Sequence, residues 1–63
     1  MFLESEADAI IAAKQRANTN GYGYAFAVRW TFGNWTVENR KPMLRDNSMK
    51  VIDVSDDGTV LLA

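Results

Sequence analysis

The clearest pattern in the chain is an alternation of large apolar residues with small or polar ones over residues 22–32 (YGYAFAVRWTF). Alternation at every second position is typical of a strand with one buried face. The large positions are Tyr22, Tyr24, Phe26, Val28, Trp30 and Phe32. The pattern therefore predicts one strand with a strongly aromatic face.

A tight turn follows this strand. Gly33 and Asn34 fit a two-residue hairpin turn, so we predict a second strand over residues 35–40 (WTVENR). The turn predicts these opposed pairs: Phe32 with Trp35, Trp30 with Val37, Val28 with Asn39, Thr31 with Thr36, and Arg29 with Glu38. The threonine pair and the opposite-charge pair both fall on the face without aromatics, which favours this register.

A helix is predicted over residues 5–18. The Ser5 side chain can accept a hydrogen bond from the free amide of Asp8, and acidic residues in the first turn suit the helix dipole. Asn20 and Gly21 supply a left-handed stop. The expected apolar stripe consists of Ala7, Ile10, Ile11 and Ala17.

The C-terminal third predicts a second hairpin. Residues 41–48 (KPMLRDNS) contain Pro42, which cannot donate to a central ladder, so they predict a connection with Met43 turned inward. In residues 49–63, a turn at Asp56, Asp57 and Gly58 fits type I geometry closed by a left-handed glycine bulge. That register opposes Val54 to Val60 and Ile52 to Leu62, and its other face carries Val51, Asp53 and Leu61.

These elements predict an α+β fold in a single domain over residues 1–63. One N-terminal helix packs on a mostly antiparallel sheet of three to four strands, in the order α-β-β-β-β with two hairpins. The pattern leaves open whether the second hairpin continues beside residues 35–40 or beside residues 22–32. A chain of 63 residues buries only about 60% of its unfolded surface, so its stability is expected to be marginal.

The helix is expected to lie on the aromatic face. A helix of this length runs about 21 Å and the eleven-residue strand about 36 Å, so the first turn of the helix is expected near Val28 or Trp30. Phe2 and Leu3 could extend the cover, but the alanine-rich stripe offers little bulk opposite the tip. The hairpin tip with Trp30, Phe32 and Trp35 is then partly exposed. The alternative is that every aromatic is core, packed under the helix and the connection.

The amino-acid composition excludes several kinds of functional site. The chain has no cysteine and no histidine, which removes disulfides, the usual zinc sites and the commonest general base near neutral pH. Paired carboxylates at a telling spacing and phosphate-binding glycine loops are also missing, so we expect no enzyme activity, no cofactor and no metal. The start lacks the features of a signal peptide and no segment is apolar enough to span a membrane, which favours a cytoplasmic protein without membrane contact.

The net charge of −1 hides a segregation along the chain. Residues 14–50 hold all seven basic side chains against two acidic ones, a local balance of +5, while each end contributes three acidic residues. The basic cluster of the predicted sheet and connection consists of Arg29, Arg40, Lys41, Arg45 and Lys50. It could steer an acidic partner or contact nucleic acid, but Arg29 and Arg40 are predicted on the face opposite the aromatics, and the sequence pI of 5.1 is low for a nucleic-acid-binding protein.

The leading hypothesis is a non-enzymatic protein interaction module, such as a small regulator or inhibitor of the phage or mobile-element type. It would dock on another macromolecule through a hairpin tip formed by Trp30, Phe32, Asn34 and Trp35, with the basic cluster steering an acidic partner. Two alternatives remain open at this point: a small nucleic-acid-binding domain, and an obligate homodimer whose functional surface lies elsewhere.

Overall fold

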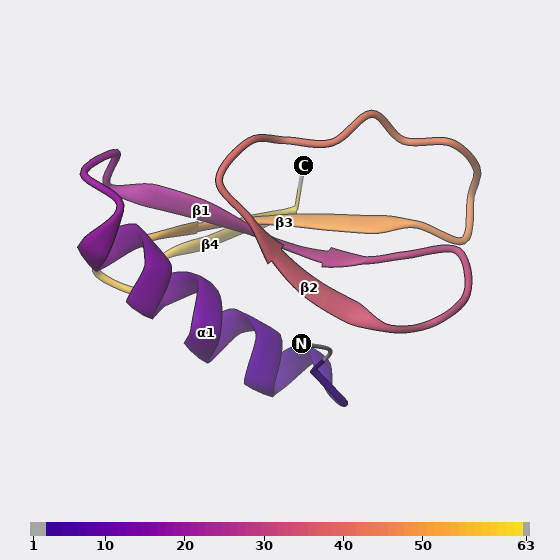
Figure 1. Cartoon of the computed structure of the whole chain (residues 1–63), viewed down its shortest axis with the longest axis horizontal. Coiled ribbons are helices and arrows are strands. Elements are labelled where there is room, and N and C mark those ends of the chain that lie inside the picture. The colour runs from indigo at the N-terminus through magenta and orange to yellow at the C-terminus, as the bar shows by residue number, and fades with distance from the viewer. Residues whose placement is uncertain (1–2, 63) are drawn as a thin grey trace.

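A computed structural model, which describes residues 3–62, places one helix against a four-stranded antiparallel sheet (Figure 1). The elements are α1 (Glu6–Thr19), β1 (Tyr24–Arg29), β2 (Trp35–Glu38), β3 (Lys50–Ser55) and β4 (Val60–Leu62). The sheet order is β2-β1-β3-β4. The α+β prediction is confirmed, and the second hairpin lies beside β1 rather than beside β2.

The start of α1 agrees with its sequence signal, whereas its buried stripe agrees only in part. Ser5 Oγ accepts a hydrogen bond from the Asp8 amide at 3.2 Å, as predicted. The buried residues, however, are Ala9, Ala13 and Ala17, and Ile11 is 57% exposed. Ala17 is buried as predicted and Ile10 packs against the core cluster, but Ala7 and Ile11 are exposed, because the side of the helix with the smallest side chains packs on the sheet.

The helix covers the face of β1 that carries Ala25 and Ala27, not the aromatic face. We call this side of the sheet the helix face. Its buried sheet residues also include Trp35, Ile52 and Val54. The expectation that α1 lies on the aromatics is wrong, and the physical reason is size: alanines on the helix meet alanines on the strand, which lets the two backbones approach closely.

The first hairpin turns through three residues rather than two. The Trp30 amide donates to the Asn34 carbonyl at 2.9 Å and the Gly33 amide to the Trp30 carbonyl at 2.8 Å. This is a type I turn followed by a left-handed glycine bulge at Gly33, whose φ is 96°. A two-residue type I′ turn would need positive φ at both central residues, and no non-glycine residue between 3 and 62 adopts it.

The register predicted for this hairpin is therefore wrong by three residues. The observed pairs are Phe26 with Glu38, Ala27 with Val37, Val28 with Thr36, and Arg29 with Trp35. An odd shift exchanges the two sides of a strand. Trp35 and Val37 consequently face α1, while Thr36 and Glu38 share the aromatic side with Phe26 and Val28.

The second hairpin follows its prediction. The Ser55 amide donates to the Thr59 carbonyl at 2.9 Å and the Gly58 amide to the Ser55 carbonyl at 3.0 Å, with φ of 91° at Gly58. Val54 opposes Val60 and Ile52 opposes Leu62, as expected. Both hairpins thus use the same turn chemistry.

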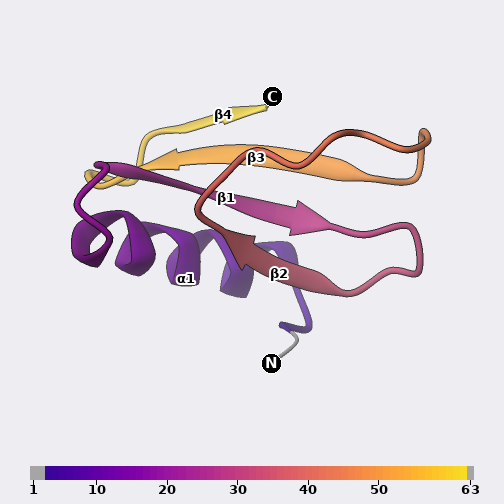
Figure 2. The ribbon, with the colours of Figure 1, turned by 45° about the horizontal axis from the view of Figure 1, so that its top comes forward.

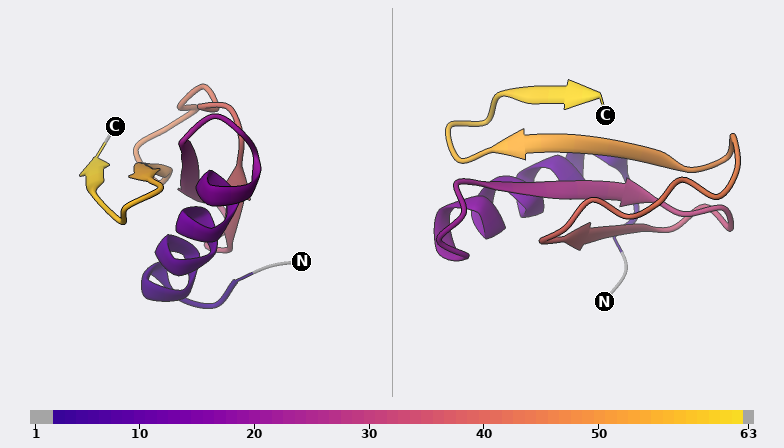
Figure 3. Two further views of the ribbon diagram at one scale, coloured as in Figure 1. Left: turned by 90° about the vertical axis from the view of Figure 1, so that its left-hand side faces the viewer. Right: turned by 90° about the horizontal axis from the view of Figure 1, so that it is seen from above.

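The other side of the sheet, which we call the aromatic face, is covered in part by the connection from β2 to β3 (residues 39–49; Figures 2 and 3). Beneath it Phe26, Val28, Val51 and Met49 form a second core cluster, against which Trp30 packs. The expected inward position of Met43 is wrong, since Met43 is 85% exposed. Met49 takes that place because it enters β3 directly over this face.

Hydrogen bonds fix the connection and one sheet edge. Asp46 accepts from the Thr31 hydroxyl at 2.9 Å and from the Ser48 amide at 2.8 Å, which ties the connection to the tip of the first hairpin. Leu3 pairs with Trp35 through backbone bonds of 3.0 and 3.4 Å and closes part of the β2 edge. The cover expected from Phe2 lies outside the described residues.

Candidate protein-binding surface

The residues predicted for an aromatic tip do not form one surface. Trp35 is buried on the helix face, with 6% of its surface exposed. Trp30 lies half-buried on the aromatic face, and its Nε1 donates to Thr36 Oγ1 at 2.6 Å. Phe32 is 78% exposed at the tip. The predicted exposure of Trp30, Phe32 and Trp35 together is wrong because the three-residue turn sends the two tryptophans to opposite faces.

Asn34 is the fourth predicted tip residue. Both polar atoms of its side chain are buried, and neither has a hydrogen-bond partner within residues 3–62. An inward amide of this kind cannot meet a partner at the surface. Phe32 is therefore the only one of the four predicted residues that the structure leaves largely open to solvent.

Two tyrosines at the other end of the sheet form a pair of exposed rings. The ring centroids of Tyr22 and Tyr24 are 6.0 Å apart in a stacked arrangement, and Tyr24 meets Phe26 edge-on at 5.6 Å. Tyr22 is 56% exposed and Tyr24 42%. Figure 1 shows the connection over the opposite part of the sheet, so it leaves this end uncovered. We call Tyr22 and Tyr24 the tyrosine pair.

Carboxylates lie on the β3 side of the tyrosine pair. Asp53 is the β3 partner of Phe26, and Phe26 is the next residue after Tyr24 on this face of β1. The amide of Asp56 donates to the carbonyl of Gly23 at 3.0 Å, which brings Asp56 beside the residue that separates the two tyrosines. This flank of the surface therefore attracts positive charge.

Asp57, the neighbour of Asp56, is held ionised by local hydrogen bonds. Donation from the Ser55 hydroxyl and from the Thr59 amide lowers the pKa of Asp57 to about 2. Hydrogen bonds to the charged form of a carboxyl stabilise that form. The turn beside the tyrosine pair thus keeps its negative charge even in mildly acidic solution.

The β2 side of the tyrosine pair is more basic. Asn20 Nδ2 donates to the Tyr24 carbonyl at 2.9 Å and to Asn39 Oδ1 at 3.3 Å. These bonds hold the bend after β2 close to Tyr24, and Arg40 and Lys41 follow that bend as exposed residues. The tyrosine pair therefore lies between a carboxylate flank and a basic flank.

The five residues of the predicted basic cluster are not gathered on one face. Arg29 opposes Lys50 on the helix face, as predicted for Arg29, and Lys50 Nζ lies 2.6 Å from Glu6 Oε1. The prediction for Arg40 is wrong because β2 ends at Glu38. Arg40, Lys41 and Arg45 are all exposed in the connection.

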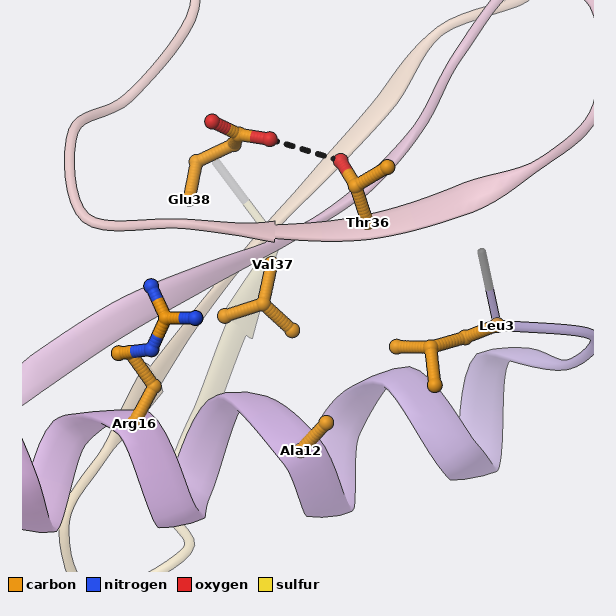
Figure 4. Close-up of a pocket in the computed structure, with 6 residues that line it drawn as sticks. All are labelled: Leu3, Ala12, Arg16, Thr36, Val37 and Glu38. Atoms are coloured by element: carbon orange, nitrogen blue, oxygen red, sulfur yellow. Dashed lines mark hydrogen bonds between the residues drawn. The ribbon is translucent and has the colours of Figure 1, made fainter. Parts of the chain in front are cut away.

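A groove of about 390 Å³ separates α1 from β2 (Figure 4). Val37 points toward the helix, while Thr36 and Glu38 point away from it, where the Thr36 hydroxyl donates to Glu38 at 2.9 Å. Arg16, on the helix side, donates to Asn39 Oδ1 at 3.3 Å. The Arg16 bond joins α1 to the segment after β2, and the Thr36–Glu38 bond lies within β2 on the other side of the sheet, so the groove is typical of a packing seam.

Within residues 3–62, no group of three acidic side chains comes close enough together to hold a metal ion. The helix found in that range is too short and too polar to cross a bilayer. The chain shows no significant match to protein-family models, to curated proteins or to solved structures.

Proposed function

We propose that this chain is a non-enzymatic protein-binding module that contacts its partner through the tyrosine pair. The observation that supports the proposal is the contrast among aromatics of the sheet: Phe26 and Trp35 are 7% and 6% exposed, whereas Tyr22 and Tyr24 keep about half of their surface open. Tyrosine offers a large rigid ring with a polar end, and it is enriched at protein interfaces and among their energetic hot spots.

The flanks of the pair favour a partner with charges of both signs. A lysine or arginine of the partner can lie over a tyrosine ring and reach Asp53 or Asp56, which combines a cation–π contact with an ion pair. Acidic groups of the partner would be drawn to Arg40 and Lys41 on the other flank, which retains the steering role expected for these two residues. The order of the flanks fixes the orientation in which such a partner docks.

Nucleic acid is the second candidate, since exposed rings can stack on unpaired bases and Arg40 and Lys41 can contact phosphates. Asp53 and Asp56 weigh against it, because carboxylates beside the rings repel a phosphate backbone. A titration with short single strands at two salt concentrations separates the candidates. Binding that weakens steeply with salt would support the nucleic-acid reading.

The protein-binding proposal is tested with the full chain as bait in an extract of the cells that express it. Proteins captured by the unmodified chain are compared with those captured by the double variant Tyr22→Ala, Tyr24→Ala, and the affinity of each captured protein is then measured with purified components. We expect the double variant to bind at least about thirtyfold more weakly, the usual loss at an aromatic hot spot. Its fold should persist because neither tyrosine belongs to a buried core cluster.

Phe32→Ala is the matched control, since it removes one exposed aromatic ring from the opposite end of the sheet. Affinity that falls equally in Phe32→Ala, or that is unchanged in the tyrosine variant, would contradict the proposal. If capture disappears after nuclease treatment, nucleic acid rather than protein is the direct partner of the chain.

A further inference from the structure

We propose that two copies of this chain associate through β4, edge to edge and antiparallel, with the twofold axis at Leu61. All three residues of β4 are exposed: Val60 42%, Leu61 64% and Leu62 71%. The strand contains no charge, no proline and no glycine, the features with which proteins usually protect an edge from pairing. This surface is distinct from the tyrosine pair, so the inference does not depend on the proposed function.

The two edges of the sheet differ in their protection. At β2, backbone hydrogen bonds with Leu3 satisfy the N–H and C=O groups of Trp35 that point outward from the sheet. At β4 no strand within residues 3–62 pairs with the outer edge. Helix α1 packs on β1, β2 and β3, and Figure 3 shows β4 lying beyond it. Val60 and Leu62 therefore extend the apolar helix face past the cover of the helix.

The hydrogen bonding of the second hairpin shows which groups of β4 are available. Hydrogen-bonded and non-hydrogen-bonded pairs alternate along antiparallel strands. Because Ser55 and Thr59 form a hydrogen-bonded pair, the next such pair is Asp53 with Leu61. The N–H and C=O groups of Leu61 then point toward β3, and those of Val60 and Leu62 point outward from the sheet.

One register of a second β4 satisfies all of these outward groups. When Leu61 opposes Leu61 of the second copy, Val60 opposes Leu62 on either side of the axis and each such pair exchanges two backbone hydrogen bonds. The central Leu61 pair is then a non-hydrogen-bonded pair, in which side chains come closest. On both faces, apolar side chains of one β4 lie beside apolar side chains of the other, and the two copies form one continuous sheet.

The charges at the ends of the hairpin complement each other in this arrangement. Arg29 and Lys50 lie in one row at the start of β3, and Asp56 and Asp57 lie at the turn at its other end. Antiparallel association places the basic row of each copy toward the acidic turn of the other. Lys50 also pairs with Glu6, so the attraction is modest and strongest at low salt.

The size of the contact sets its strength. Three residues per copy bury less than the roughly 800 Å² per partner of a standard stable interface. We therefore expect a dimer that forms as concentration rises rather than a permanent one, in contrast to an obligate homodimer. Sedimentation equilibrium from about 10 µM to about 1 mM should show the change in mass.

Cysteine cross-linking tests the register, because the chain has no cysteine of its own. Leu61→Cys should form a disulfide-linked dimer under mild oxidation, since opposed residues of a non-hydrogen-bonded pair lie within disulfide range. Val60→Cys is the matched control: its counterpart is displaced along the strand, so it should cross-link at least about tenfold more slowly. Equal rates for the two variants would overturn the proposed register.

Charge variants test the same pair without a covalent bond. Leu61→Lys should remain monomeric because two lysines meet at the axis, and its fold should persist because Asp53 lies opposite on β3. Mixing Leu61→Lys with Leu61→Glu should restore a mixed dimer. A monomer at every concentration of the unmodified chain, or a dimer that Leu61→Lys leaves unchanged, would overturn the inference.

Discussion

The two faces of the sheet achieve burial in different ways. On the helix face, alanines of α1 meet Ala25 and Ala27 of β1, so the backbones of two regular elements lie close together. On the aromatic face, Phe26, Val28 and Met49 fill the space beneath an irregular connection. Along β1, small side chains let the helix approach closely, whereas the large side chains of the other side are covered by an irregular connection that follows their outline.

The size of side chains, as well as their hydrophobicity, therefore decides which side of β1 faces the helix. The aromatic face is the more hydrophobic side of β1, yet the helix packs on the other side. An aromatic strand would have held α1 away from the sheet and left its alanine stripe without contacts. The consequence for function is that the open end of the aromatic face exposes the tyrosine pair.

The largest expected effect comes from Trp35→Ala on the helix face. Trp35 is 6% exposed and belongs to the cluster under α1, so its loss should cost about 3–5 kcal/mol of unfolding free energy. That is most of the stability expected for a domain of this size. Urea unfolding followed by circular dichroism measures it. Trp30→Ala, at the half-buried tryptophan of the other face, should lower the unfolding free energy by clearly less. Equal losses would mean that the two tryptophans contribute equally to stability.

A smaller effect is expected from added volume. Ala27→Leu places a large side chain between β1 and α1 at a position with no exposed surface, and overpacking of this kind costs about 1–3 kcal/mol. Val28→Leu enlarges the adjacent buried residue on the aromatic face, where the irregular connection can shift. The two variants are compared by thermal unfolding. A larger loss for Val28→Leu would show that the connection is as rigid as the helix.

Acid should weaken the cover of the aromatic face rather than the buried core under α1, with the smallest effect of the three. The Ser48 amide, followed by the Thr31 hydroxyl, lowers the pKa of Asp46 below its ordinary value of 3.8. The contribution of Asp46 to holding the connection is thus complete above that value and is lost as the pH falls through the lowered pKa. The helix face has no buried charged residue within residues 3–62.

Nuclear magnetic resonance can follow the two faces separately during this titration. The Ser48 amide, which donates to Asp46, should shift before the indole N–H of Trp35 when the pH is lowered from 6 to 2. Asp46→Asn removes the titrating group and should abolish the early shift at Ser48. Simultaneous changes at both positions in the unmodified chain would mean that acid unfolds both faces together.

The second hairpin shows what the sequence predicts well. The stretch Asp56, Asp57, Gly58 has one favourable turn solution, and the alternation on both sides agrees with it, so the register followed correctly. At the first hairpin, Gly33 lies in the turn as predicted, but at a different place in it. It is the last of three loop residues rather than the first of two, and that difference reversed the faces of β2.

The candidate site was missed for a related reason. With the helix predicted on the aromatic face, Tyr22 and Tyr24 are expected to lie at its covered end and Trp35 at the exposed tip. The signal that could have corrected this is the match between Ala9, Ala13 and Ala17 at helical spacing and Ala25 and Ala27 at strand spacing. The exposed end of the aromatic face depends on where the connection crosses, and no local pattern in residues 39–49 specifies that path.

The three-residue turn at the first hairpin also constrains how the chain can change during evolution. Removing or adding one residue among Thr31, Phe32 and Gly33 would exchange the sides of β2, bringing Trp35 out to solvent and Thr36 against the helix. The length of this turn is therefore inherited together with the core, although its residues lie on the surface. The irregular connection over residues 39–49 can absorb an added or removed residue without exchanging the sides of a strand. Length variants of this protein should therefore accumulate there.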